Sequence, residues 1–204
     1  MLEHVHWLGH AGIKITGEKV IYVDPYAIGG GEKADLIMVT HDHYDHLSMA
    51  DIEKIRGRDT ILIVPASADV HYSGPVREVH PGDSLTVENV TVRVIPSYNL
   101  NKPFHPRSRN NVGYLFTTGD RTYYHAGDTD RIPEMKEIRA DVAFLPVGGT
   151  YTMNPAEAAG AAEDVHCSIA VPIHWGSVVG SRRDAETFEA LCPCEVAVLE
   201  PETA

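Results

Sequence analysis

Three histidines and two aspartates are clustered in the run 41–46, whose sequence is His-Asp-His-Tyr-Asp-His. The apolar segment 35–39, typical of a strand, precedes this run. Side chains two apart on an extended backbone point the same way, so His41 and His43 can bind one metal ion. If the chain then turns, Asp45 and His46 can reach a second ion. Imidazole and carboxylate are ligands for zinc, iron(II) and manganese. A solvated polar turn is the alternative, but packing requires no histidine trio at a strand end.

Two further candidate ligands follow predicted strands. Asp128 comes after Gly127 and a strand-like segment, so its carboxylate can stand free and bridge two ions through its two oxygens. His174 ends another apolar segment, before a glycine. A simple turn and a structural histidine are the ordinary interpretations of these two residues taken alone. Beside the run 41–46, both are predicted to be metal ligands.

The elements that must position these residues are mostly short strands. Turn-bounded segments rich in Val, Ile and Tyr predict strands at 5–8, 12–16, 19–23, 36–40, 60–64, 76–79, 84–87, 91–95, 113–117, 122–125, 142–146, 169–174 and 196–199. Capping patterns predict helices at 48–56, 154–165 and 183–191. Strands in two batches, each followed by helices, predict an α+β fold with two packed sheets and helices outside. Residues 97–111 form a long loop, and such loops are usually functional.

Composition limits the class of protein. The 204 residues, 43% of them hydrophobic, predict a single domain over 1–204 made of two similar halves that meet near residue 110. The start has no signal-peptide pattern and the apolar runs are too short to span a bilayer, so we expect a cytoplasmic protein. Cys167, Cys192 and Cys194 make no disulfide framework, and a lone Cys-x-Cys is weak support for a metal site. The net charge of −12 disfavours nucleic acid and membrane as partners.

The chain resembles the metallo-β-lactamase superfamily in the order and context of six residues: His41, His43, Asp45, His46, Asp128 and His174. The segments 7–11 (WLGHA), 124–129 (YHAGDT), 146–153 (PVGGTYTM) and 172–174 (PIH) resemble more narrowly the branch that contains ascorbate-phosphate lactonase. This resemblance implies a four-layer αβ/βα sandwich with a dinuclear metal site at one edge, and hydrolase activity. It does not imply the lactone substrate, because fold and metal site do not fix the substrate.

One ligand position departs from the superfamily pattern. The superfamily usually places a histidine just after the strand that here occupies 91–95, where this chain has Ser97-Tyr98-Asn99. His105 can fold back from the long loop, Asn99 can offer an amide oxygen, or the first ion can have three protein ligands. Imidazole binds zinc or iron far better than an amide oxygen does, so we expect His105.

The expected mechanism is hydrolysis by a hydroxide that bridges two divalent ions, zinc in the first place, with manganese or iron(II) as alternatives. Coordination can lower the pKa of water from 15.7 to about 7. On this hypothesis Asp128 bridges the ions and is, with Asp45, a catalytic carboxylate. His41, His43 and His105 hold one ion, and Asp45, His46 and His174 the other. Three residues are expected to orient the ligands from behind: His10, Asp24 and His125.

The loop around His105 suggests the substrate. The segment 89–119 contains no acidic residue, and its cations Lys102, Arg107 and Arg109 flank His105. Arginine suits carboxylate or phosphate recognition, so these cations predict a small anionic substrate of the lactone or phosphoester class. A solvated loop that balances an acidic surface is the alternative. Thr150 and Tyr151 are expected to line the site.

Two other functions remain open on the sequence alone. One is nuclease or phosphodiesterase action on nucleic acid, which the acidic charge disfavours. The other is a metal-binding protein that does not hydrolyse anything. Homo-oligomer formation is likewise left open by the sequence.

Overall fold

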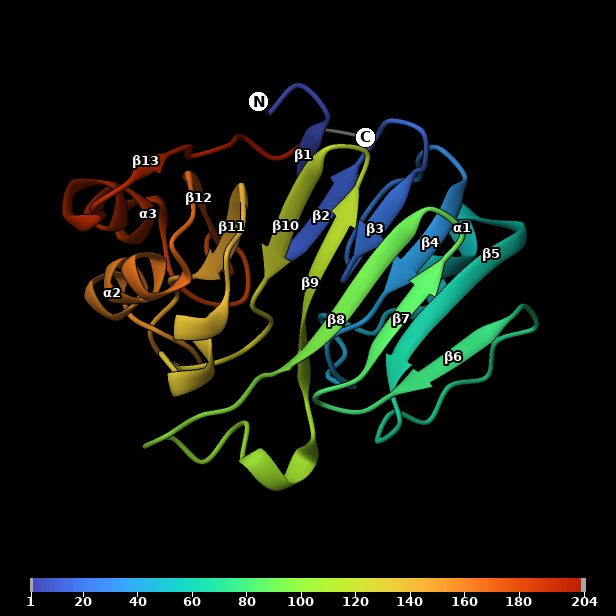
Figure 1. The fold of residues 1–204 in the computed structure, drawn as a ribbon, viewed down its shortest axis with the longest axis horizontal. Helices are drawn as coiled ribbons and strands as arrows, with labels where there is room; N and C mark the ends of the chain where they lie inside the picture. The colour runs from blue at the N-terminus through green and yellow to red at the C-terminus, as the bar shows by residue number, and fades with distance from the viewer. Residues whose placement is uncertain (1, 203–204) are drawn as a thin grey trace.

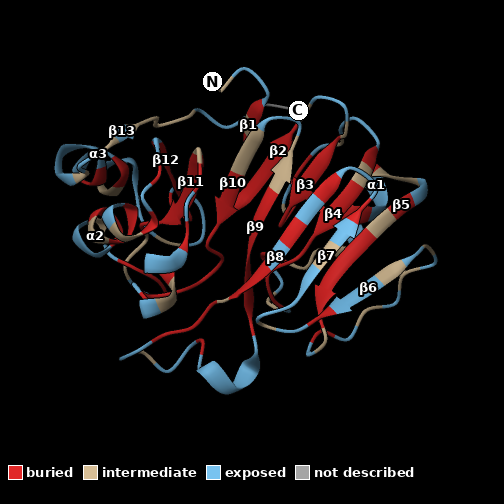
Figure 2. Ribbon diagram, viewed as in Figure 1, coloured by how far each residue is buried: buried red, intermediate tan, exposed pale blue. Residues whose placement is uncertain are grey.

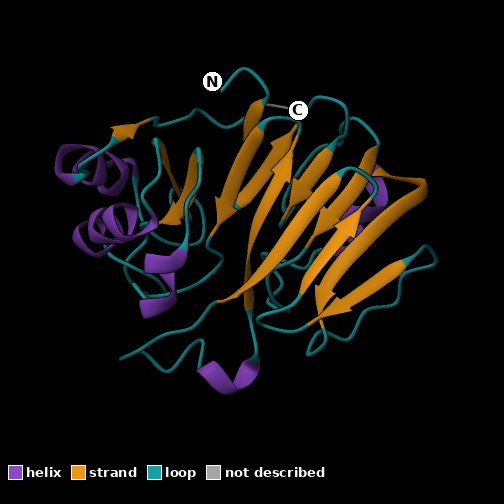
Figure 3. Ribbon diagram, viewed as in Figure 1, coloured by secondary structure: helices purple, strands orange, loops and turns teal. Residues whose placement is uncertain are grey.

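The computed structural model describes residues 2–202 and has the predicted α+β sandwich of two sheets with helices on both outer faces (Figures 1 and 3). The first sheet has the order β1-β2-β3-β4-β5-β6, and the second has the order β13-β12-β11-β10-β9-β8-β7. The strands of the first sheet are β1 Val5–Gly9, β2 Gly12–Ile15, β3 Ile21–Val23, β4 Ala34–Met38, β5 Arg56–Pro65 and β6 Val76–Val79. Those of the second are β7 Ser84–Val87, β8 Val90–Pro96, β9 Val112–Thr118, β10 Arg121–His125, β11 Val142–Pro146, β12 Ile169–Ile173 and β13 Glu195–Val196.

Each sheet combines antiparallel and parallel pairing. In the first sheet β1, β2 and β3 pair antiparallel, and β3 to β6 pair parallel. In the second sheet β7 to β10 pair antiparallel, and β10 to β13 pair parallel. The chain passes from the first sheet to the second at 80–83, because β7 and β8 pair with the strands that follow them. The boundary between two similar halves near residue 110 stays a prediction.

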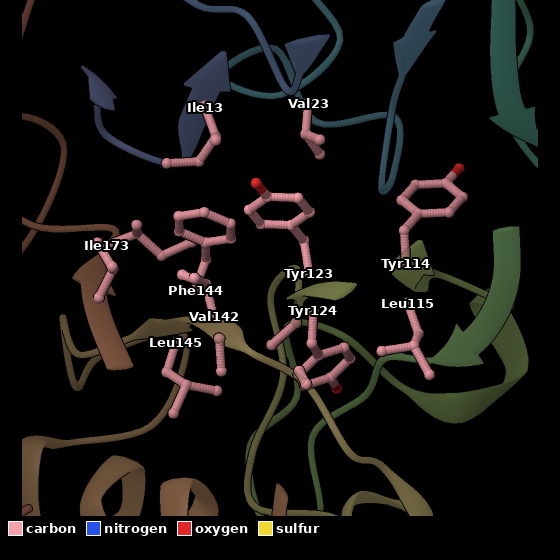
Figure 4. Close-up of a cluster of buried hydrophobic side chains, with 14 of the residues drawn as sticks. Ile13, Val23, Tyr114, Leu115, Tyr123, Tyr124, Val142, Phe144, Leu145 and Ile173 are labelled. Atoms are coloured by element: carbon pink, nitrogen blue, oxygen red, sulfur yellow. The ribbon is translucent and has the colours of Figure 1, made fainter. Parts of the chain in front are cut away.

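The core lies mainly between the sheets. Figure 4 shows Ile13 and Val23 of the first sheet facing Tyr123 and Phe144 of the second. The next residue on each second-sheet strand points the other way, because side chains alternate along a strand. The strands that contribute these residues are buried along most of their length (Figure 2).

Three α-helices cover the outer faces. α1 Met49–Ile55 packs Ile52 and Ile55 into a separate apolar cluster outside the first sheet. α2 Pro155–Val165 and α3 Arg182–Leu191 cover the second sheet beside β11 and β12 (Figure 1). Asn154 and Glu157 form the predicted capping box of α2, with Pro155 at its first position. No helix within residues 2–202 is long and apolar enough to cross a membrane.

The sequence predicted most elements with small errors at their ends. The strand predicted at 196–199 ends at Val196, and the Ala197 N–H makes the last bond to β12, with the Ala170 carbonyl. Further on, the Glu202 N–H donates to the Trp7 carbonyl of β1. Two 3₁₀ helices were not predicted, η1 Arg107–Arg109 and η2 Pro133–Glu137. η1 lies within the long loop 97–111.

Candidate metal centre

The candidate ligands come together where several strands from both sheets end. The run 41–46 follows β4, His105 lies on the loop after β8, Asp128 follows β10, and His174 follows β12. Ring nitrogens of His41, His43 and His105 lie within 4.8 Å of one another and form one potential ion site. A second potential site is formed by His10, Asp45, His46 and His174 under the same limit. The sequence therefore identified side chains that the fold does bring together.

Asp128 stands between the two groups. Its Oδ2 lies 3.1 Å from His174 Nε2 and 3.4 Å from His105 Nε2, and its Oδ1 lies 3.3 Å from His46 Nε2. Ser97 fixes this turn from behind, since its hydroxyl donates to the Asp128 carbonyl at 2.9 Å. The carboxylate is therefore placed to share its oxygens between both groups.

Several buried polar atoms of the centre make no hydrogen bond. They are His46 Nε2, Asp128 Oδ1 and both ring nitrogens of His174. Buried polar groups without partners are costly in a folded protein, and His46 Nε2 and His174 Nε2 both face the Asp128 carboxylate, so these atoms need a common partner. His174 Nδ1 points away from this group. A cation between imidazole and carboxylate donors supplies that partner, and the residues thus fit the divalent ions that the sequence implied.

The motif after β4 is held by a tight turn and a buried aspartate. The N–H groups of His46 and Leu47 both donate to the His43 carbonyl, which brings Asp45 and His46 round to the second group. Asp24 accepts from the Thr40 N–H at 2.8 Å and lies 2.7 Å from His46 Nδ1. That contact points His46 Nε2 at the centre.

Burial and neighbouring charges set the protonation states of the candidate ligands. Burial lowers the pKa of His41 well below its ordinary value and lowers that of His105. Burial alone would raise the pKa of the Asp128 carboxyl, but the facing His174 and His46 hold it well below its usual range. Burial alone would lower the pKa of His46, but the Asp128 and Asp24 carboxylates raise it well above its ordinary value, so a metal ion that binds there must displace a proton from His46.

His105 reaches the centre because Asn99 closes its loop. The Asn99 side-chain oxygen accepts from the His105 N–H at 3.0 Å, and the Asn99 N–H donates to the His105 carbonyl at 2.7 Å. The Asn99 amide nitrogen donates to Asp130 and to the Tyr151 carbonyl. The His105 Nδ1–H also faces that carbonyl, at 3.3 Å, so Nε2 points to His43. Of the open alternatives at this position, the structure brings His105 to the ligand group and gives Asn99 a bracing role.

The three residues expected behind the ligands have different surroundings. His10 Nε2 lies 3.0 Å from Asp45 Oδ2 and Asp24 contacts His46, so both adjoin ligands directly. His10 also belongs to the second ligand group by distance. His125 is fully buried, donates from Nε2 to the Ala11 carbonyl and accepts from the Gly127 N–H. It therefore contacts the glycine turn that precedes Asp128 and no candidate ligand by a hydrogen bond within residues 2–202.

The predicted substrate-binding cations each lie beside a carboxylate. Lys102 Nζ is 2.6 Å from Asp130, Arg107 is 3.0 Å from Glu134, and Arg109 is 3.0 Å from Asp42. None of the three lines the pocket over the metal centre in the described chain. The structure thus ties them to the protein's own acidic groups.

The pocket over the centre has a volume of about 290 Å³. Its reactive floor and its mouth are lined by His43, Tyr44, Asp45, Phe104, His105, Asp128, Tyr151, His174 and Val178. Tyr151 is present as predicted, whereas Thr150 is exposed and is not among these residues. Tyr44, Phe104 and Val178 also line the pocket and were not predicted. Each lies close along the chain to a candidate ligand, His43, His105 or His174, and this closeness could have indicated that they line the pocket.

A larger cavity, of about 400 Å³, lies elsewhere, against Leu8, Lys14, Tyr22 and the glycines 29–31. Its lysine is paired with Glu202 at 2.7 Å. None of the candidate ligand groups lines it among residues 2–202. The smaller pocket is therefore the candidate active site, because the chemistry converges there.

Comparison with known proteins agrees with this centre. The family model of the beta-lactamase superfamily domain matches residues 4–174. The UPF0173 metal-dependent hydrolase of Methanopyrus kandleri is 31% identical, over 97% of this chain and 96% of the relative. The homologous hydrolase of a Geobacillus species is 32% identical, with the same two coverages. A solved structure from Parabacteroides distasonis, proposed to be a metal-dependent hydrolase, superposes with a TM-score of 0.83 at 29% identity, covering 98% of this chain and 93% of that one.

The chain therefore belongs to the metallo-β-lactamase superfamily, among the UPF0173 metal-dependent hydrolases. It is an enzyme, a metal-dependent hydrolase with a candidate site for divalent ions. The sandwich fold that the sequence resemblance implied is confirmed by the sheets and by this kinship.

Proposed function

We propose that the protein hydrolyses a small ester, of the lactone or phosphoester class, at a dinuclear centre that holds zinc. One observation carries the proposal: the Asp128 carboxylate faces both the His105 and the His174 groups, with an oxygen that no hydrogen bond satisfies. A bridging carboxylate between two histidine-rich groups is the donor arrangement that two neighbouring divalent ions need. Manganese and iron(II) accept the same donors and are outcomes of the test.

In this proposal the chain's residues divide the work. His41, His43 and His105 hold one ion, and Asp45, His46 and His174 hold the other. Asp128 contacts both. When bound, the ions supply Lewis acidity and a water of lowered pKa as the nucleophile. His10 keeps Asp45 oriented through their 3.0 Å contact, and Asp24 does the same for His46.

The ionisation of the carboxylates favours cation binding at neutral pH. Burial alone would raise the pKa of Asp45, but the contact with His10 lowers it. Asp128 is held low by its facing histidines. Both carboxyl groups are therefore anionic in neutral solution and available as ligands.

The buried centre also controls access of water and substrate. His41, His46 and His174 are almost completely buried, while the pocket opens to solvent past Tyr44 and Phe104. A substrate that enters through this mouth replaces bulk water above the centre, which strengthens electrostatic interactions within it. The anionic substrate predicted from Lys102, Arg107 and Arg109 stays a prediction, and the carboxylate partners of these cations leave it without support from the pocket wall.

The test combines metal content with turnover. Protein purified with zinc, manganese or iron(II) is analysed by plasma mass spectrometry and assayed against lactones, phosphodiesters and RNA. We expect two ions per chain, zinc-dependent ester hydrolysis and no RNA cleavage, since the chain carries a net charge of −12.

Variants assign the activity to the centre. His43→Ala and Asp128→Ala should lose metal and turnover together, whereas His71→Ala, which removes an exposed histidine away from the centre, should lose neither. Full turnover in Asp128→Ala would contradict the proposal. Hydrolysis of RNA alone would favour the nuclease alternative, and metal binding without any hydrolysis the non-enzymatic one.

A further inference from the structure

We infer that the mouth of the active-site pocket is a subsite for a neutral, apolar, ring-bearing group of the substrate. This inference rests on the proposed function and adds the class of substituent that the enzyme selects. The subsite, called the apolar rim below, consists of Tyr44, Phe104, Tyr151 and Val178, which line the pocket together with the candidate ligands.

The apolar rim gathers exposed hydrophobic side chains at one place. Tyr44 is 67% exposed, Phe104 42% and Val178 38%, and all three border the same pocket. Across residues 2–202, the other large hydrophobic side chains exposed to this degree are Leu100 and Leu191. Apolar side chains grouped around a concave site, rather than scattered singly, mark a surface that binds a ligand.

The apolar rim is held in place before any ligand arrives. The rings of Phe104 and Tyr151 meet edge to face, with centroids 4.7 Å apart and planes at 84°. The Tyr151 carbonyl accepts from the Asn99 amide, which also braces His105. The rings of Tyr44 and Tyr26 also meet edge to face, with centroids 5.9 Å apart. Fixed aromatic faces favour a flat ring, because stacked and edge-to-face contacts depend on relative orientation.

The apolar rim lies next to the reacting centre along the chain. Tyr44 stands between His43 and Asp45, and Phe104 directly precedes His105. A ring seated on these side chains is therefore attached to a group that reaches the centre within the same pocket of about 290 Å³. That volume suits a small substrate with a single ring.

Charge argues for a neutral substituent. No Lys or Arg lines the pocket in the described chain, and the nearest loop cations are tied to Asp42, Asp130 and Glu134. The charged groups that do line the pocket are the carboxylates Asp45 and Asp128. The bound ions lie at the floor among their ligands, so an anionic substituent at the mouth would have no cationic side chain beside it to offset its desolvation.

Hydroxamic acids test this inference without requiring turnover, because they bind metal centres through one shared group. Binding of acetohydroxamic acid, benzohydroxamic acid and the monohydroxamate of succinic acid to zinc-loaded protein is measured by calorimetry. We expect the phenyl compound to bind about tenfold more tightly than the methyl compound, a difference of about 1.4 kcal/mol. The carboxylate compound should bind no more tightly than the methyl compound.

Variants locate the preference. Phe104→Ala and Val178→Ala should each reduce the phenyl-to-methyl ratio at least threefold while leaving the affinity for acetohydroxamic acid unchanged, which also shows an intact centre. Leu191→Ala removes an equally exposed apolar side chain on α3 and should leave the ratio unchanged.

Equal affinities for the phenyl and methyl compounds, or tightest binding of the carboxylate compound, would overturn the inference. An equal loss of affinity for all three hydroxamic acids in Phe104→Ala would also overturn it. If the phenyl preference holds but no ester is hydrolysed, the proposed function fails and the subsite stands. If esters are hydrolysed but the phenyl compound binds no more tightly than the methyl compound, the subsite is wrong and the proposed function stands.

Discussion

Removal of the Asp130 carboxylate should weaken one ion site and spare the other. Asp130 is buried, and its oxygens accept from the Asn99 amide at 3.1 Å, the Leu100 N–H at 2.9 Å and Lys102 Nζ at 2.6 Å. These contacts order the start of the loop whose closing pair is Asn99 and His105. Asp130→Ala therefore releases His105 without touching a candidate ligand.

The size of the effect follows from the hydrogen bonds that are lost. Asn99 keeps its bond to the Tyr151 carbonyl, and the half-buried Lys102 can turn to water, so these two losses are small. The remaining cost is the lost acceptor of the Leu100 N–H and a less ordered loop, together about 1.4–2.8 kcal/mol. Because binding of an ion must order this loop again, the affinity of the His105 site for zinc should fall about ten- to a hundredfold.

Competition for zinc with a chromophoric chelator measures this loss. The wild type should titrate in two steps, and Asp130→Ala should weaken one step while the other stays within twofold. Asp130→Asn retains one acceptor oxygen, so the zinc affinity of its weakened step should lie between those of the wild type and Asp130→Ala. Glu53→Gln, which removes the exposed partner of Arg56 and has no contact with this loop, is the control. Wild-type affinity in both steps of Asp130→Ala would refute the bracing role of the loop.

Three further substitutions test other parts of the structure. Gly148→Ala would place a Cβ 2.5 Å from the His174 carbonyl oxygen, so thermal unfolding should show a loss of about 1–3 kcal/mol together with loss of one ion; unchanged stability would contradict the tight approach. Burial alone would raise the pKa of Asp51, but its hydrogen bonds with Lys54, Ser48 and the Ala27 N–H together lower it, so its contribution is present above about pH 3.9 and is lost as the pH falls further. Urea unfolding of Asp51→Asn should therefore show destabilisation at neutral pH that fades in acid, and a constant difference would count against this assignment. Arg109→Gln should leave KM unchanged for neutral and anionic esters alike, whereas a raised KM for the anionic ester alone would restore its predicted role in substrate binding.

The ligands could be predicted from the sequence because they follow local rules. His41 and His43 alternate on an extended segment, and Asp128 and His174 each follow an apolar strand, so the run 41–46 together with these positions predicts them as candidate ligands. The two-sheet fold was predictable for a similar reason, since the period of two in the strands and the capping box at Asn154 are local signals.

The partners of the loop cations could not be predicted from the sequence. The segment 89–119 looks uniformly basic, but Asp42, Asp130 and Glu134 lie outside it and reach it only through the fold. The role of Asn99 could not be predicted either, because its hydrogen bond with His105 depends on a loop closure that no sequence pattern predicts.

The most direct test of the dinuclear centre is a crystal structure of the zinc-loaded protein with anomalous data at the zinc edge. The proposal predicts two anomalous peaks about 3.5–4 Å apart, bridged by Asp128, as expected for paired hydrolytic ions. One peak should carry His105 and the other His174. A single peak, or a second one without Asp128 among its ligands, would contradict it.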